Sequence, residues 1–153
     1  MHIRRYQAGD EVQLRKIFFH TIRNINSKDY SKEQVTAWAP DEFDAKQWQE
    51  RVAAINPFIA TINHHIVGYA DIQPDGYIDH FFCHWQHQGQ GVGKTLMQTI
   101  FSQAKQNNIN RLYSHASITA KPFFEHFGFT MVKQQSVEIR GQILTNFVME
   151  KFV

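Results

Sequence analysis

The segment His87–Thr95, with the sequence HQGQGVGKT, most constrains the fold of this chain. It stands between an aromatic-rich stretch, Tyr77–His84, and a helical pattern that runs from Gly91 to Asn107. Glycines at alternate positions let the backbone turn sharply and approach a ligand without a Cβ clash. The main-chain N–H groups of such a turn, with the first N–H groups of a following helix, form an anion site. The segment therefore predicts a strand, a turn that binds phosphate, and a helix.

Two familiar phosphate motifs do not fit these glycines. A nucleotide-triphosphate loop needs a glycine five positions before Gly93, and that residue is Gln88. The dinucleotide fingerprint needs its third glycine one residue later than Gly93. A tight turn without a ligand stays an alternative, although three glycines in five residues are more than such a turn requires. We therefore expect a phosphate-containing ligand of another kind.

The first third of the chain is expected to be mainly helical. After a short strand, apolar residues from Leu14 to Ile25 recur every three or four positions, which is typical of one helix face. Asp10 and Gln13 have the spacing of an N-cap with a capping box at the start of that helix. The expected elements are a strand at His2–Tyr6, a helix ending near Asn26, a helix at Ser31–Ala39, and a helix at Asp44–Ile55 capped by Asp44.

The rest of the chain mixes strands and helices. Strands are expected at Phe58–Asn63, Ile66–Gln73, Tyr77–His84, Arg111–His115, Phe129–Ile139 and Ile143–Val153. Helices are expected at Gly91–Asn107 and Thr119–Phe127, and Asp75–Gly76 is a strong turn signal. Strands and helices alternate only in this second part, which indicates one mixed α/β or α+β domain over residues 1–153.

Composition excludes several classes of protein. With 153 residues and 42% hydrophobic content, the chain can bury a core without a metal or disulfide. No apolar run approaches the ~18 residues that span a membrane, and Met1–Asp10 lacks the apolar stretch of a signal peptide. The lone cysteine, Cys83, forms no internal disulfide and fits a reducing cytoplasm. A net charge of +2 is too weak to indicate a nucleic-acid partner.

Two motifs give the chain a resemblance to a known family. Gln88-x-x-Gly91-x-Gly93 matches the Gln/Arg-x-x-Gly-x-Gly/Ala pattern of the GNAT superfamily of N-acetyltransferases. The segment Ser117–Phe129 is similar to that family's Asn-x-x-Ala-x-x-Phe-Tyr-x-x-x-Gly-Phe. Trp38-Ala39-Pro40 resembles the first insert of compact bacterial members. The two motifs stand in the family's order, and the expected elements fit the whole chain.

The resemblance implies a fold and a co-substrate. The fold is a single GNAT-like domain whose mixed, mostly antiparallel sheet is splayed at the cofactor site and flanked by helices. The co-substrate is acetyl-coenzyme A, with its pyrophosphate on the amides of Gln88–Lys94 and its pantetheine along the strand through Phe82. The implied cofactor-binding residues are Phe82, Cys83, Gln88, Gly89, Gln90, Gly91, Val92, Gly93, Lys94, Ser117 and Phe123.

Acetyl transfer to an amine needs a base and a donor to the thioester oxygen. The main-chain N–H of Cys83 is our candidate donor, because Cys83 stands at the equivalent position of the family's strand. Asp79 is the candidate base, since some relatives carry a Glu there and residues 79, 81 and 83 would share one face of an extended strand. His80 and His84 are its rivals, because imidazole titrates near neutral pH.

The leaving thiolate poses a question. Relatives usually have a tyrosine where this chain has Phe124, which cannot donate a proton. The thiolate leaves either without direct protonation or with help from Tyr113, Ser117 or His126. Ser117 also replaces an asparagine that relatives use to contact pantetheine.

The acceptor site is expected in the segment Asn26–Phe43. Tyr30 and Trp38 are our candidate substrate residues because an aromatic pair can hold a cationic amine, although they could also simply pack the helix pair. We expect no metal, since His80 and His84 would lie about 13 Å apart on a strand. A metal held by Cys83, His84 and His87 in a loop is the weaker alternative.

These observations predict an N-acetyltransferase. The expected reaction is direct attack of a small-molecule primary amine on acetyl-coenzyme A in a ternary complex, in a monomer or homodimer without nucleic acid or membrane partners. Acetylation of proteins or peptides is one alternative. A coenzyme A binding module without turnover is another, motivated by Phe124.

Overall fold

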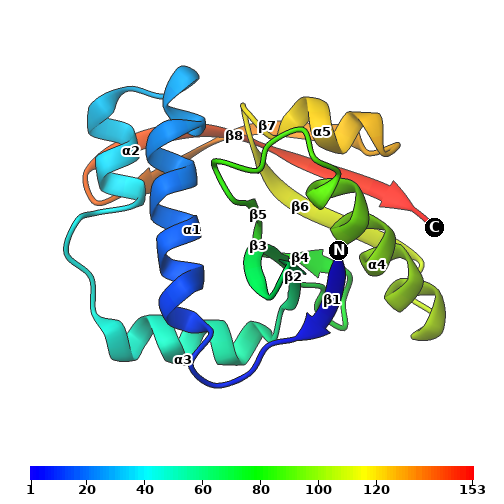
Figure 1. The fold of residues 1–153 in the computed structure, drawn as a ribbon. Helices are drawn as coiled ribbons and strands as arrows, with labels where there is room; N and C mark the ends of the chain where they lie inside the picture. Colours follow the sequence, from blue (N-terminus) through cyan, green and yellow to red (C-terminus); the bar gives the residue numbers. More distant parts are fainter.

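The computed structural model describes residues 1–153, which form eight strands, five α-helices and one short 3-10 helix (Figure 1). In chain order the elements are β1 (His2–Arg5), α1 (Glu11–Asn24), the 3-10 helix η1 (Asn26–Lys28), α2 (Lys32–Trp38), α3 (Ala45–Ile55), β2 (Phe58–Ile62), β3 (His65–Ala70), β4 (Tyr77–Ile78), β5 (Phe81–Cys83), α4 (Val92–Gln106), β6 (Arg111–Ser117), α5 (Lys121–His126), β7 (Thr130–Ile139) and β8 (Gln142–Phe152). No helix is both long enough and apolar enough to cross a membrane.

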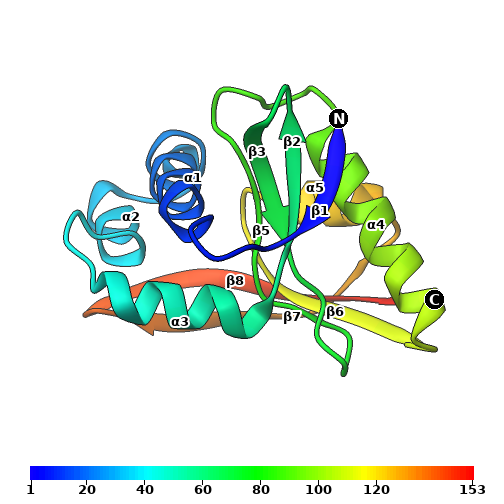
Figure 2. The ribbon, with the colours of Figure 1, turned by 60° about the horizontal axis from the view of Figure 1, so that its bottom comes forward.

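The strands form two half-sheets. The first has the order β1-β2-β3-β5 with antiparallel neighbours throughout, and the second has the order β4-β6-β8-β7 with only β4 and β6 parallel. Figure 2 shows that the two half-sheets run in crossed directions. Because β5 and β6 do not pair, the sheet is open between them. The expected mixed, mostly antiparallel and splayed sheet is confirmed.

The chain changes half-sheets at Asp79–His80, so the single strand expected over Tyr77–His84 is wrong. β4 pairs with β6, whereas β5 pairs with β3. The physical reason is the buried carboxylate of Asp71. Its Oδ1 accepts hydrogen bonds from the main-chain N–H groups of Asp79 at 3.0 Å and His80 at 2.6 Å. These bonds satisfy the backbone at the break, where a strand ladder would otherwise be needed.

Helices cover the sheet in two groups. Figures 1 and 2 show α1, α2 and α3 on one side and α4 and α5 on the other. Each group encloses its own buried apolar cluster. Ile59 and Ala60 are neighbours on β2 but belong to different clusters, because side chains alternate across a strand.

The helix starts were predicted with mixed success. Ser31 and Gln34 form a full capping box at α2, and Asp44 caps α3 by accepting from the N–H of Gln47 at 3.0 Å. The expected capping box at Asp10 is wrong. The Asp10 carboxylate instead accepts from both terminal nitrogens of Arg4, at 2.8 and 3.0 Å, and so ties β1 to α1.

Candidate active site

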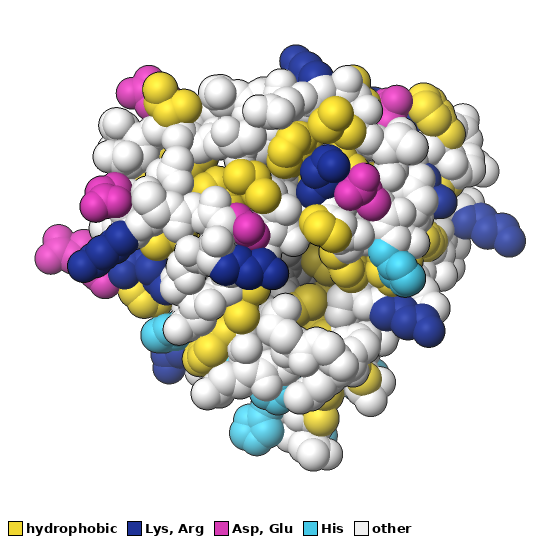
Figure 3. Space-filling model, turned by 90° about the horizontal axis from the view of Figure 1, so that it is seen from above, with side chains coloured by type: hydrophobic (Ala, Val, Ile, Leu, Met, Phe, Trp, Pro, Cys, Tyr) yellow, Lys and Arg dark blue, Asp and Glu magenta, His cyan; other side chains and the backbone are white.

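A cavity of about 700 Å³ lies where the two half-sheets separate. Arg15, Phe18 and Thr21 line it from one edge of α1, and Ile25 lines it at the C-cap of that helix. The other walls come from the segment between α1 and α3, the break between β4 and β5, the end of β6, α5, and the adjoining ends of β7 and β8. Figure 3 shows hydrophobic side chains gathered around a hollow in the face seen from above. A cavity of this size and lining is typical of sites for small ligands.

The loop from Gln88 to Gly91 leads from β5 to the start of α4. None of the main-chain N–H groups from Gln88 to Lys94 donates a hydrogen bond within the protein. Gly89 and Gly91 have φ of +73° and +81°, and the space beside each of them is open. A row of unpartnered donors at the N-terminus of a 15-residue helix is chemically suited to a phosphate group.

The side chains of the loop are arranged differently from its main chain. Gln88 turns back, and its Nε2 donates to the main-chain oxygens of Cys83 at 3.0 Å and His84 at 3.2 Å. Gln90 and Lys94 are exposed, whereas Val92 is buried. The side chains of Gln90, Val92 and Lys94 thus differ in exposure. What these three residues share is a main-chain N–H without a hydrogen-bond partner, which is available to a phosphate.

Gly93 serves packing as well as backbone access. A Cβ at this position would lie 2.8 Å from Cε1 of Phe123 and 3.5 Å from Sγ of Cys83. The absence of a side chain therefore lets α4 approach both α5 and β5. Phe123 also packs on Phe81, with 5.1 Å between ring centroids, and lines the cavity.

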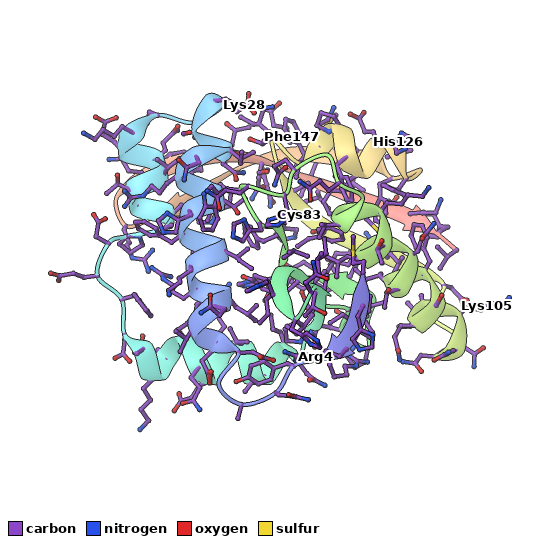
Figure 4. All side chains as sticks on the ribbon, viewed as in Figure 1. Arg4, Lys28, Cys83, Lys105, His126 and Phe147 are labelled. Atoms are coloured by element: carbon purple, nitrogen blue, oxygen red, sulfur yellow. The ribbon has the colours of Figure 1, made fainter.

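The main-chain N–H of Cys83 faces away from β3. The bonds from His84 to Val67 and from Asp71 to His80 identify hydrogen-bonded positions of the β3–β5 ladder. Hydrogen-bonded and non-hydrogen-bonded positions alternate in antiparallel strands, so the Gly68–Cys83 pair is of the second kind. The N–H and C=O of Cys83 therefore point toward the opening between the half-sheets. Figure 4 labels Cys83 near the centre of the molecule, between α1 and α4.

The thiol of Cys83 has a different character from its main chain. Burial raises the pKa of the Cys83 thiol to about 12. The side chain is therefore a neutral thiol at physiological pH and a poor nucleophile. Its neighbour Phe82 packs edge-on against Phe18, with 5.1 Å between ring centroids, so the strand joins the cavity to α1.

Asp79 and His80 sit at the strand break and line the cavity side by side. Asp79 is partly exposed and lies 3.8 Å from Nη2 of Arg51. His80 is only 2% exposed, and its Nδ1 forms a hydrogen bond with the hydroxyl of Tyr69 at 3.0 Å. Burial, helped by the charge of Arg51, lowers the pKa of His80 to about 3, so this ring is neutral. Because the strand breaks here, residues 79, 81 and 83 do not share the face that an unbroken strand would give them.

Of the three residues considered as proton donors in place of a tyrosine, Ser117 alone lines the cavity. Its Oγ accepts from the N–H of Ala120 at 3.0 Å and from Nδ2 of Asn26 at 3.3 Å, which leaves the hydroxyl proton free to donate. The hydroxyl of Tyr113 donates to Asp75 at 2.6 Å. His126 is exposed on the last turn of α5, away from Cys83 (Figure 4). Phe124 lines the cavity and is 2% exposed.

Tyr30 and Trp38 both line the cavity and contact each other edge-on, with 5.6 Å between ring centroids. The hydroxyl of Tyr30 donates to the oxygen of Thr145 at 2.6 Å and accepts from the N–H of Ile118 at 2.9 Å. These bonds hold the first helices against β6 and β8, so Tyr30 has a structural role as well as a position in the wall.

Four residues that lie at or beside the site were not predicted from the sequence: Arg15, Thr21, Arg51 and Asp71. Thr21 donates its hydroxyl to the oxygen of Cys83 at 2.9 Å. Signals existed for two of them, since Thr21 lies on the expected buried helix face and Asp71 is a charged residue inside an expected apolar strand. For Arg15 the signal was weaker, because it lies three residues before Phe18 at the edge of that face.

The histidine-rich loop after β5 is an aromatic cluster. His84 stacks on Trp85 with 3.8 Å between ring centroids, and Trp85 contacts His20 at 4.5 Å. The structure has no group of three or more His, Cys, Asp or Glu side chains placed to hold a metal ion. Partial burial, with the charges of His87 and His20, lowers the pKa of His84.

Comparisons with known proteins agree with this geometry. A family model described as "Acetyltransferase (GNAT) domain" matches residues 26–151. The chain is 38% identical over 149 residues to a protein of Escherichia coli K12 named "Uncharacterized N-acetyltransferase YafP", covering 97% of this chain and 94% of that protein.

Solved structures share the fold. A GCN5-related N-acetyltransferase from Rhodopseudomonas palustris, also described as "Aminotransferase, Class-II", has a TM-score of 0.94 and 31% identity over 99% of this chain and 95% of that one. YncA from Salmonella typhimurium, solved with its cofactor acetyl-CoA, has a TM-score of 0.72 and 18% identity over 99% and 93%.

Proposed function

This chain belongs to the GNAT family of acetyltransferases, and on that premise we propose that it transfers the acetyl group of acetyl-coenzyme A to a primary amine of a small molecule. The reaction is direct attack of the amine on the thioester within a ternary complex. The observation that carries the proposal is the continuity between two features. A row of free amides at residues 88–94 lies beside a cavity of about 700 Å³ that residues of the first three helices line.

The free amides from Gln88 to Lys94 bind the pyrophosphate. Gly89 and Gly91 fit this role because a side chain at either position would occupy the open space beside the loop. The pantetheine arm then enters the opening between β5 and β6, along Phe82 and Cys83, with Ser117 and Phe123 on the opposite wall. When bound, the thioester supplies the activated acetyl carbon.

The main-chain N–H of Cys83 donates to the thioester oxygen as that oxygen gains negative charge. Support comes from the direction of this N–H, which points into the opening and is not used by the strand ladder. A donor fixed in a strand needs no reorganisation during the reaction, which is the condition for efficient stabilisation of an oxyanion.

Asp79 accepts the proton of the attacking amine, directly or through water. The carboxylate is partly exposed, lines the cavity and is steadied by Arg51. His80 is the rival base, but its Nδ1 is engaged by Tyr69 and its ring is enclosed by Phe18, Trp48 and Phe82. Asp79 is therefore better placed to reach an amine.

Ser117 donates a proton toward the leaving sulfur. Its oxygen already accepts two hydrogen bonds, so the hydroxyl proton is the group left to donate. Phe124 offers no proton at the position where relatives usually carry a tyrosine. That difference also favours a second candidate function, a module that binds coenzyme A without turnover.

We favour a small-molecule acceptor because residues of α1, of the segment through Tyr30, Trp38 and Phe43, and of α3 together line one end of the cavity. A cavity of this volume is typical of sites for small molecules.

The test is release of the coenzyme A thiol from acetyl-coenzyme A with a panel of small amines and peptides, beside calorimetry with coenzyme A. Turnover with small amines is expected. Turnover with peptides alone would establish the protein-modifying alternative. Tight binding of coenzyme A without thiol release across the panel would establish the binding module.

A further inference from the structure

Arg15 presents a guanidinium to the end of the cavity that lies farthest from the glycine loop along α1. The residue is 8% exposed and lines the cavity. Its Nη2 donates to the main-chain oxygen of Pro40 at 2.9 Å, but its Nε is buried without a hydrogen-bond partner. No carboxylate lies within 4.0 Å of its nitrogens. Arg15 is therefore a buried cation without a direct ion-pair partner.

The surroundings of Arg15 are aromatic and positive. Its Cζ lies 4.1 Å from the ring centroid of Phe43, 5.2 Å from that of Phe18 and 5.3 Å from that of Trp48. Arg140, at the turn between β7 and β8, lines the same cavity and donates to the oxygen of Ala37 at 2.7 Å. Burial lowers the pKa of Arg15, and the charges of Arg140 and Arg23 lower it further, yet a guanidinium remains protonated.

No carboxylate near this end of the cavity forms an ion pair with Arg15. Glu11, one turn before Arg15, accepts from the hydroxyl of Tyr6 and the N–H of Gly9 through Oε1, and its Oε2 is buried without a hydrogen-bond partner. Asp44 caps α3, Asp79 faces Arg51, and Asp41 pairs with Arg23. A buried guanidinium without an ion pair is unfavourable, so an anion brought by a ligand would be stabilised here.

We propose that Arg15, with Arg140 beside it, binds a carboxylate of the acceptor. The acceptor class is then a primary amine that carries a carboxylate across an apolar spacer, an inference that rests on the proposed acetyl transfer. Nη1 of Arg15 has no hydrogen-bond partner and, unlike Nε, is not enclosed by the protein, so this nitrogen can donate to a carboxylate oxygen.

The geometry also sets the length of the spacer. Thr21 contacts Cys83 at the reacting end, and Arg15 precedes Thr21 by six residues, about 9 Å along the helix axis. Phe18 lies between them on the same edge of α1 and contacts both Arg15 and His80. The carboxylate and the amine are therefore separated by more than the single carbon of an α-amino acid, and the spacer lies along Phe18 and Trp48.

A matched trio of acceptors tests this: 4-(aminomethyl)benzoate, its benzamide and benzylamine carry the same amine on the same ring. For the wild-type protein we expect kcat/KM to be roughly tenfold or more higher for the benzoate than for either neutral amine. In Arg15→Gln we expect the ratio of kcat/KM between the benzoate and the neutral amines to fall to about one, whatever the change in their absolute rates. Arg140→Gln reduces the preference less, and Arg5→Gln, which removes an arginine from β1, leaves it unchanged.

Binding is measured beside turnover, so that the two proposals fail separately. Calorimetry should give the folded variants Arg15→Gln and Arg140→Gln the same affinity for coenzyme A as the wild type. With coenzyme A bound, the benzoate raises the melting temperature of the wild type but not that of Arg15→Gln, whether or not thiol is released. Equal use and equal binding of all three amines by the wild type, or an equal loss for all three in Arg15→Gln, would overturn the carboxylate site and leave acetyl transfer standing. Binding of the benzoate that depends on Arg15, without thiol release, would support the carboxylate site and refute acetyl transfer.

Discussion

The hydroxyl of Thr21 donates a hydrogen bond to the main-chain oxygen of Cys83, at 2.9 Å. Nε2 of Gln88 donates to the same oxygen at 3.0 Å. Through these two bonds α1, which lines the acceptor end of the cavity, and the glycine loop are both joined to β5. Cys83, whose N–H we propose as the donor to the thioester oxygen, is thus held from both sides of the site.

Removal of the Thr21 bond tests this arrangement. In Thr21→Val we expect about 1 kcal/mol lower stability and about fivefold lower kcat, because one of the two bonds that fix Cys83 is lost. Urea unfolding and thiol release measure the two effects. The matched control is Thr99→Val on α4, where the hydroxyl bonds only to the oxygen of Thr95 in the same helix. A kcat of Thr21→Val equal to that of the control would show that the bond does not position Cys83.

Gly91→Asp tests the phosphate site. The new carboxylate would lie in the open space beside Gly91 and repel a pyrophosphate, so we expect a fall in coenzyme A affinity of more than about tenfold by calorimetry. Gly91→Ala is the control, because it imposes the same backbone strain at φ of +81° without the charge. Equal affinities in the two variants would contradict a phosphate at this loop.

Asp79→Asn tests the base. We expect a lower rate at neutral pH and a rate profile shifted to higher pH, because the amine must then lose its proton to solvent before it attacks. The measurement is kcat/KM for one amine from pH 6 to pH 10, with His80→Gln measured in parallel. An unchanged profile in Asp79→Asn together with a shifted profile in His80→Gln would assign the role to His80.

Much of this architecture could be predicted from the sequence because local rules decide it. The glycine spacing identified the loop, periodicity identified α1 and α4, and Asp44 was correctly predicted as the cap of α3. The roles of Asp79, Cys83 and the loop residues in the reaction stay predictions, although all of them lie at or beside the cavity.

The failures have a common physical cause, which is a partner distant in sequence. Asp10 looked like a cap but is taken by Arg4 from β1. The strand over Tyr77–His84 looked continuous, yet Asp71 binds the backbone at Asp79–His80 and divides it. Arg15 was not predicted as a site residue, because the residues that enclose it, Phe43 and Trp48, come from distant parts of the chain.

The burial of His80 predicts a pH dependence of stability. Its pKa is about 3 in the folded protein and near 6.5 when unfolded, because burial disfavours the charged ring. Below about pH 6 the unfolded chain therefore binds one more proton than the folded protein. The free energy of unfolding then falls by about 1.4 kcal/mol per pH unit until the pH reaches the folded pKa.

Urea unfolding at pH 7, 5 and 4 should show a smaller loss of the free energy of unfolding in His80→Gln than in the wild type. Asp71, with its pKa raised to about 6 by burial, titrates in both proteins and largely cancels in the comparison. Parallel losses in the two proteins would mean that His80 is charged in the fold.

Ser117 and Phe124 allow a test of the leaving-group acid by loss and rescue. Removing a positioned proton donor lowers rates by about a hundredfold or more, so we expect a loss of that order in kcat for Ser117→Ala.

Phe124→Tyr places a phenol at the position where relatives usually carry one, and Phe124 lines the same cavity as Ser117. Phe124→Tyr alone should change kcat little, because the serine already supplies the proton, whereas Ser117→Ala with Phe124→Tyr should recover most of the lost rate. Thermal unfolding of each variant separates this effect from loss of the bond between Ser117 and the N–H of Ala120. An unchanged kcat in Ser117→Ala, or an equal gain from Phe124→Tyr in both backgrounds, would mean that the thiolate leaves without a proton from Ser117.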